Sequence, residues 1–163
     1  MLRVKNFVPA ISLEGFEEAN DGRRGSGDYE KVMHAMELMK EHKLPFGISA
    51  CYTSQNYQDI SSEPFFDMII DAGALFVWFF HYMPVGNGAV PELLPNPEQR
   101  TEVYKRIREF RQTKPIFSMD FQNDAEYVAD VSPEEEDIFI LMQKVMWSLV
   151  YSSTTPTPIT PQC

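Results

Sequence analysis

Four polar residues near the start of the chain carry side chains suited to binding a charged small molecule. Ser12 and Glu14 follow the short apolar run NFVPAI, and Arg23 and Arg24 lie in the polar, glycine-rich stretch after it. A carboxylate accepts two hydroxyl hydrogen bonds, and a guanidinium forms a bidentate pair with a carboxylate. These residues therefore suit a ligand that has both groups. The alternative is that Ser12 only satisfies backbone groups and the arginines form a solvated loop.

Apolar runs and turn residues predict the elements that position these side chains. Residues 15–28 are expected to form a loop, and Asp28 is expected to cap a helix whose apolar face includes Val32, Met36 and Leu38. The run ALFVWFFHYM has no alternation, which is typical of a strand covered on both faces of a parallel sheet. We expect strands near 6–13, 44–52, 74–83 and 115–121, with helices near 28–42, 63–72 and 97–113.

This alternation predicts an α/β fold with about four parallel strands and crossover helices, as in half of a (β/α) barrel or part of a doubly wound sheet. Half a barrel has two exposed strand edges, which favours pairing with another chain. Ligands in such folds bind at the carboxyl ends of strands. The candidate residues there are Ser12, Glu14, Thr53, Ser54, His81 and the Pro84-Val85-Gly86 turn. His81 lies within an aromatic strand, so we expect a satisfied core histidine.

The composition and net charge of the chain limit the classes of molecule that it is expected to bind. The chain has 163 residues, 44% hydrophobic content and a formal net charge of −10, which predicts a globular protein that binds neither nucleic acid nor an anionic membrane. The longest apolar run, residues 74–80, is too short to cross a bilayer and the first residues do not resemble a signal peptide, so we expect a cytoplasmic protein. Cys51 and Cys163 are far apart and predict neither a disulfide framework nor a local metal site, and Cys51 is expected to be a free buried thiol.

The segment PAISLEGFEEANDGRRGSGDYEKVMHAMELMKEHKLPFGISACYTSQN resembles the middle of a radical S-adenosylmethionine (SAM) barrel. It has a strand ending in Ser-Leu-acid-Gly, an Arg-Gly loop, a helix and the next strand, and the resemblance extends over about residues 8–128. It implies a partial TIM-like barrel in which Ser12, Glu14 and one of Arg23 or Arg24 face SAM. Glu14 would bind the ribose hydroxyls and an arginine the methionyl carboxylate, while Pro84, Val85 and Gly86 would hold the adenine.

The sequence departs from that family in its cysteines. Radical SAM enzymes bind the [4Fe-4S] cluster that reduces SAM through a CxxxCxxC loop, and nothing in this sequence matches that loop or the glycine-rich SAM motif. The resemblance therefore predicts a fragment of an iron-sulfur oxidoreductase that would cleave SAM to a 5′-deoxyadenosyl radical when intact, and that is inactive alone. Its substrate is not readable.

Two other interpretations stay open. The chain could be a non-catalytic half-barrel that pairs with a separate cluster-bearing chain. It could also be a fragment of a TIM-type metabolic enzyme that binds phosphate, for which the loop Gly25-Ser26-Gly27 is weak support.

The last 35 residues differ in character from residues 1–128. Residues 129–163 predict an amphipathic helix and then a disordered end, STTPTPITPQC. Back-translated with suitable codons and read in the adjacent frame, residues from Ala129 encode GCIAGGRRYLHINAKGDVEPC. That string resembles the auxiliary-cluster (SPASM or twitch-like) domains of radical SAM enzymes. We therefore expect a lost base near Val128 and a tail that is out of frame and has no selected function.

Overall fold

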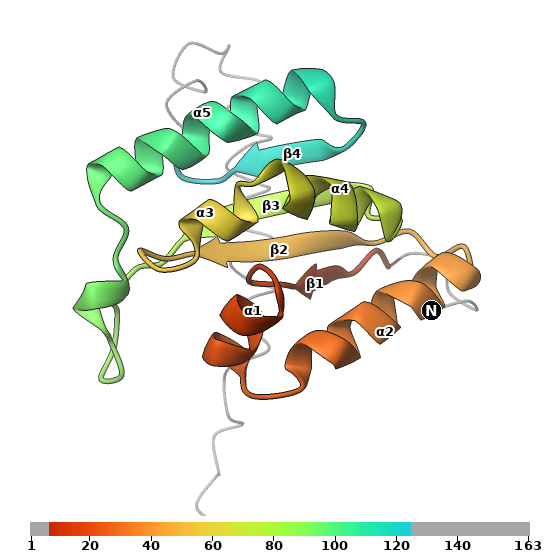
Figure 1. The fold of residues 1–163 in the computed structure, drawn as a ribbon, viewed down its shortest axis with the longest axis horizontal. Coiled ribbons are helices and arrows are strands. Elements are labelled where there is room, and N and C mark those ends of the chain that lie inside the picture. The colour runs from red at the N-terminus through yellow and green to blue at the C-terminus, as the bar shows by residue number, and fades with distance from the viewer. Residues whose placement is uncertain (1–6, 125–163) are drawn as a thin grey trace, which may run out of the picture. The chain divides into compact units, whose positions relative to one another are not determined.

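A parallel β-sheet forms the centre of the computed structural model, which describes residues 7–124. The four strands pair in chain order, β1-β2-β3-β4, and each neighbouring pair is parallel (Figure 1). The strands are β1 (Ala10–Ser12), β2 (Gly47–Tyr52), β3 (Phe76–His81) and β4 (Phe117–Asp120). The predicted α/β class with four parallel strands is confirmed. Each strand is shorter than expected because the predicted runs include the residues that lead into and out of the sheet.

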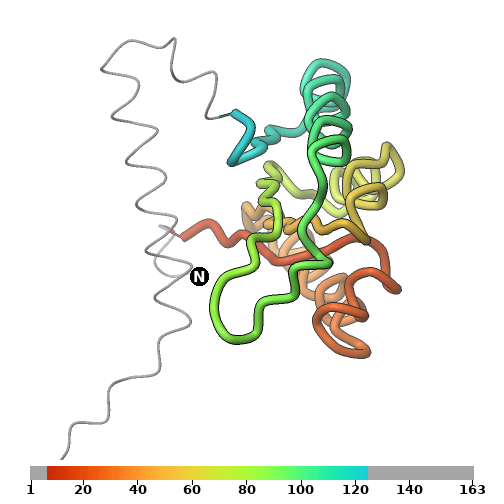
Figure 2. Tube along the Cα trace, turned by 90° about the vertical axis from the view of Figure 1, so that its left-hand side faces the viewer, coloured from red at the N-terminus to blue at the C-terminus, as the bar shows by residue number. Residues whose placement is uncertain are grey.

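Helices connect the strands and lie together on one face of the sheet (Figure 2). They are α1 (Glu17–Arg24), α2 (Asp28–Glu41), α3 (Tyr57–Ile60), α4 (Glu63–Asp71) and α5 (Pro97–Thr113), with a 3-10 turn, η1 (Pro91–Leu93), before α5. The Ser62 hydroxyl caps α4 by accepting from the Phe65 amide. A capping box of Asn96 and Gln99, with Pro97 in the first turn, begins α5. The predicted helices at 63–72 and 97–113 are therefore confirmed to within a residue.

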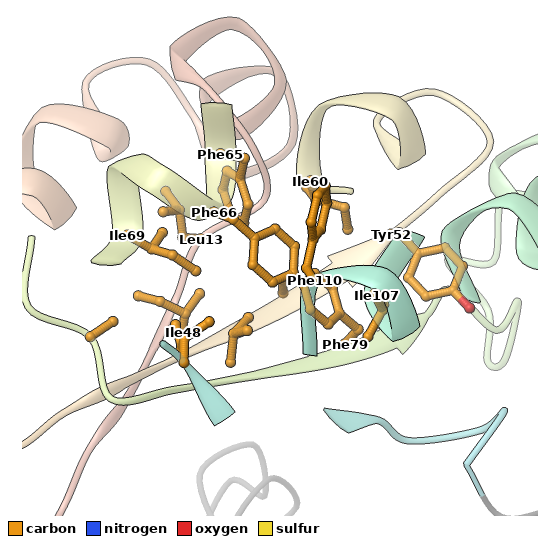
Figure 3. Packing of buried hydrophobic residues seen from close by; sticks show 14 of the residues in the cluster. Leu13, Ile48, Tyr52, Ile60, Phe65, Phe66, Ile69, Phe79, Ile107 and Phe110 are labelled. Atoms are coloured by element: carbon orange, nitrogen blue, oxygen red, sulfur yellow. The ribbon is translucent and has the colours of Figure 1, made fainter. Parts of the chain in front are cut away.

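The apolar core lies between the sheet and these helices. Alternate residues of β2 and β3 point into it, so Ile48, Ala50, Val77 and Phe79 are completely buried. The Phe66 ring of α4 stacks on Phe79 at 5.7 Å between centroids. Burial of each large apolar side chain contributes roughly 1.5–3 kcal/mol. Figure 3 shows this layer, with Leu13, Ile60, Phe65, Ile69, Ile107 and Phe110 around the same rings.

The opposite face of the sheet is not covered by the described helices. The side chains of Phe76, Trp78 and Phe80 alternate with the buried residues of β3, and all three are only partly buried. Gly47 lies beside Phe76 in register, and a Cβ atom at Gly47 would overlap the Phe76 ring. Within residues 7–124 the helices cover one face of β3, and its run owes its unbroken apolar character to a partly buried aromatic row on the second face.

Three further expectations are corrected. The predicted loop 15–28 contains helix α1, which has almost no apolar residue and so gives no periodicity. The residue that caps α2 is Gly27 rather than Asp28, which is instead the first helical residue. Leu38 is 41% exposed and lies outside the apolar face of α2.

The described residues up to Asn123 belong to one compact unit. The predicted tail, 129–163, lies outside the described residues, as do residues 1–6 and 125–128. Among residues 7–124, no helix combines the length and the apolar composition that a membrane-spanning segment needs.

Candidate functional site

Glu14 lies just beyond the carboxyl end of β1, and its side chain is buried. The Leu13 amide continues the pairing of β1 with β2 by donating to the Ser49 carbonyl at 3.1 Å. Gly15 then turns the chain sharply, with φ of +123°, into α1. The Glu14 residue is 1% exposed. A carboxylate in such a position must be paired, because burying an unpaired charge costs several kcal/mol or more.

Four protein donors satisfy the Glu14 carboxylate. Oε1 accepts from Nε and Nη2 of Arg24 at 3.2 and 2.6 Å, and Oε2 accepts from Nη1 of Arg23 at 3.2 Å and from the Cys51 amide at 3.1 Å. An ionised carboxylate offers about four lone-pair sites. All of them are used here, so a ligand hydroxyl could bind Glu14 only by displacing one of these donors. The binding of ribose hydroxyls by Glu14 therefore stays a prediction, and it requires the displacement of one of these donors.

The two arginines give this cluster a net positive charge. One carboxylate and two guanidiniums sum to +1, in a chain whose formal net charge is −10. Burial alone would lower the pKa of Arg23, but the neighbouring Glu14, Cys51 and Tyr82 groups offset it, and the pKa is raised. The arginine side chains are 33% and 35% exposed. The cluster can therefore receive an anion from solvent while its own carboxylate stays buried.

Helix α1 brings both arginines to this place. Its first turn carries Glu17 and Glu18, and its last turn carries Arg23 and Arg24, so the charges complement the helix dipole. The turn from α1 to α2 is closed by Asp21, whose carboxylate accepts from the Gly27 and Tyr29 amides. These two hydrogen bonds hold the pKa of Asp21 below its usual value.

The same contacts bear on the phosphate-binding interpretation. An anion nest in the loop Gly25-Ser26-Gly27 needs free amides at the start of α2. The Gly27 and Tyr29 amides already donate to Asp21. The described structure therefore gives that interpretation no support.

The other predicted cofactor-binding residues, Ser12, Pro84 and Gly86, lie at the end of β1 and in the loop after β3. Ser12 is half-buried, in register with Ser49, two residues before Glu14. Pro84 and Gly86 lie in the loop that follows β3, where Gly86 has φ of +85°. The structure thus groups Glu14 with Arg23 and Arg24. It places Ser12 at the end of β1, two residues before Glu14, and residues 84–86 in a separate, largely exposed loop.

Tyr82, which the sequence did not single out, links that loop to the cluster. The Arg23 guanidinium lies over the Tyr82 ring, 5.9 Å from its centroid. The Tyr82 hydroxyl accepts from the Val90 amide at 2.9 Å, at the far end of the loop. A tyrosine directly after an apolar strand is the only sequence signal that could have drawn attention to it.

His81 is placed differently from expectation, whereas Cys51 is a free thiol as expected but only partly buried. The Nδ1 atom of His81 is buried and has no hydrogen-bond partner within residues 7–124, so it is not the satisfied core histidine expected. Burial, and then the charge of Arg100, lowers the pKa of His81. Cys51 is free and partly buried, and burial raises the pKa of its thiol.

Comparison of the chain with protein-family models finds no match, and comparison with curated proteins finds no significant match. The resemblance to radical SAM enzymes therefore stays a prediction.

The residues of this chain fit SAM better than they fit the cluster. Two partly exposed guanidiniums suit the methionyl carboxylate, and a serine two residues before Glu14 suits a ligand hydroxyl. A [4Fe-4S] cluster needs three or four thiolates, and the sequence has only two cysteines. The part of the chain that the structure describes also contains no group of three or more His, Cys, Asp or Glu side chains that could hold a metal.

Proposed function

We propose that this chain is part of a radical SAM barrel and that its Arg23–Arg24 pair binds the carboxylate of the methionyl group of SAM. The observation that carries the proposal is the cluster of Glu14, Arg23 and Arg24 at the carboxyl end of β1. Ligands of parallel α/β folds bind at this end of the strands. The net charge of +1 attracts a carboxylate, and the partial exposure of both arginines leaves them accessible to it.

In this proposal the buried Glu14 holds the two guanidiniums in place. The two hydrogen bonds from Arg24 to Oε1 and the hydrogen bond from Arg23 to Oε2 fix both side chains before a ligand arrives, which lowers the entropy lost on binding. Ser12, at the end of β1, is proposed to bind a ligand hydroxyl, and the turn at residues 84–86 is proposed to contact the adenine.

The intact enzyme would supply reductive cleavage of SAM through its iron-sulfur cluster. The two cysteines of this chain cannot hold that cluster, so the role proposed for these residues is binding and orientation.

Calorimetric titration of SAM into the full chain tests the proposal. We expect SAM to bind, decarboxylated SAM to bind at least tenfold more weakly, and Arg24→Gln to weaken SAM binding by roughly 10- to 100-fold, since hydrogen bonds between charged groups contribute about 1.5–3 kcal/mol. Arg108→Gln is the matched control, because Arg108 lies against Tyr104 on α5. If the folded chain gives neither heat nor a shift in melting temperature with millimolar SAM, or binds both ligands equally, the proposal is wrong.

The second candidate is a non-catalytic half-barrel that pairs with a separate cluster-bearing chain. It is favoured by the sheet, which within residues 7–124 has β1 and β4 as edges and carries a partly exposed aromatic row on the face away from the helices.

Sequencing the locus from upstream of Met1 through the Cys163 codon, in all frames, separates the candidates. A CxxxCxxC segment in a continuous upstream frame and a missing base near Val128 favour one broken gene. A separate upstream frame, with the tail confirmed, favours the paired half-barrel.

A further inference from the structure

Two asparagines bind the main chain of Glu14 from opposite sides. Asn20 of α1 is completely buried, and its Oδ1 accepts from the Glu14 amide at 3.1 Å. Asn56, just before α3, is 5% exposed, and its Nδ2 donates to the Glu14 carbonyl at 2.8 Å. Both polar groups of the Glu14 backbone are therefore held by side chains rather than by the sheet.

The other polar atom of each asparagine side-chain amide also forms hydrogen bonds. Nδ2 of Asn20 donates to the Asp28 carboxylate at 3.2 Å, which ties the site to the start of α2. Oδ1 of Asn56 accepts from the amide and the hydroxyl of Thr53 at 2.6 and 2.9 Å. Both side chains act as donor and acceptor at once, which an ionised aspartate cannot do. A replacement must therefore leave buried groups unsatisfied.

Asn56 also acts on Arg23 through a shared acceptor. The Cys51 carbonyl accepts from Nδ2 of Asn56 at 3.2 Å and from Nη1 of Arg23 at 3.2 Å. The Cys51 amide donates to Glu14. Asn56 therefore contacts the peptide groups of both residues that hold Arg23, without touching either arginine itself.

We infer that Asn56, with Asn20 as its counterpart, is a positioning residue for the arginine pair, and this inference rests on the function proposed above. Asn56 joins the carboxyl end of β2 to Glu14, two residues after β1, so it sets the distance between the Glu14 carboxylate and the Cys51 peptide. Both groups hold Arg23, and Glu14 alone holds Arg24. A small displacement at Asn56 is thereby transmitted to the guanidiniums that would bind the ligand carboxylate.

The test uses Asn56→Asp in the full chain, with Asn56→Ser as a milder variant if the first does not fold. In Asn56→Asp a carboxylate oxygen faces the Glu14 and Cys51 carbonyls, so the arginines lose their fixed positions. We expect about tenfold weaker SAM binding and a smaller preference for SAM over decarboxylated SAM. Ser61→Ala is the matched control, because Ser61 is also completely buried and hydrogen-bonded, to the Tyr57 carbonyl, but does not contact the Glu14 cluster.

A readout independent of SAM separates this inference from the proposed function. In ¹⁵N spectra the Arg24 Nε–H, which donates to Glu14, should exchange slowly in the unaltered chain and in Ser61→Ala, and rapidly in Asn56→Asp or Asn56→Ser. This result would support positioning by Asn56 even if SAM does not bind. A folded Asn56 variant whose Arg24 Nε–H exchanges as slowly as in the unaltered chain would overturn the inference, whatever SAM does.

Discussion

The buried Glu14 carboxylate determines much of the chemistry at the scale of single residues. Its four donors come from α1 and from β2, so the charge is compensated only when β1, α1 and β2 are all in place. Removal of one partner from a buried ion pair leaves an uncompensated charge, which is strongly destabilising. The cluster thus couples the local fold to the proposed binding site.

Gly15 is the residue that allows this geometry. Its φ of +123° is unfavourable for other residues, and a Cβ atom there would lie 3.1 Å from Cβ of Ala19 and 3.3 Å from Cβ of Asp59. We expect Gly15→Ala to lower the free energy of unfolding by roughly 1–3 kcal/mol. Gly22→Ala, in α1 with open space around it, should be neutral or stabilising by up to about 1 kcal/mol. Urea denaturation measures both, and equal effects would contradict the strain argument.

Helix α1 shows how an element can be built without an apolar pattern. Its eight residues, EEANDGRR, include one alanine and no larger apolar side chain. The helix is kept in place by contacts to other elements, in which Asn20 holds β1 and the arginines hold Glu14. Its stability therefore depends on tertiary contacts rather than on the intrinsic propensity of its residues.

Helix α5 is the opposite case, because its start is encoded locally. The Asn96 side chain accepts from the Gln99 amide at 2.8 Å, and the Gln99 side chain accepts from the Asn96 amide at 2.9 Å. We expect Asn96→Ala to reduce the free energy of unfolding by about 1 kcal/mol, as typical for loss of an N-cap. Asn87→Ala, in the exposed loop after β3, is the control and should change it little. Urea denaturation followed by circular dichroism compares the two, and an Asn96→Ala curve that matches the Asn87→Ala curve would argue against the cap.

At the scale of the whole described unit, the sheet has one face covered by helices and two edge strands. Phe117, the first residue of the edge strand β4, is 60% exposed, and Leu75, next to it across the sheet, is 59% exposed. An edge strand has unpaired backbone groups that can pair with another chain, and exposed apolar side chains beside it favour that pairing. This feature is common to both functional candidates, since either would bring further strands to the same edges.

A charge on that edge should therefore reduce self-association of the isolated chain. We expect Phe117→Lys to lower the concentration-dependent rise in apparent mass measured by light scattering, because lysine on an edge opposes strand pairing. Leu38→Lys, on the outer side of α2, is the control and should leave association unchanged. Association that persists unaltered in Phe117→Lys would show that β4 is not the contact.

The amino-acid sequence by itself determined the order of most elements and the two largest helices after β2, because apolar runs, proline positions and capping residues are local signals. The place of Glu14 after a predicted strand, and the resemblance to the radical SAM family, also directed attention to Glu14, Arg23 and Arg24. Only the tertiary structure decided that these three residues pair with one another, that Asp21 closes the adjoining turn, and that Asn56 holds Glu14 and Cys51. The Asn56–Glu14 contact spans 42 residues and the Cys51–Glu14 contact spans 37. No local pattern encodes such pairs, because they exist only once parallel strands bring their carboxyl ends to the same edge of the sheet.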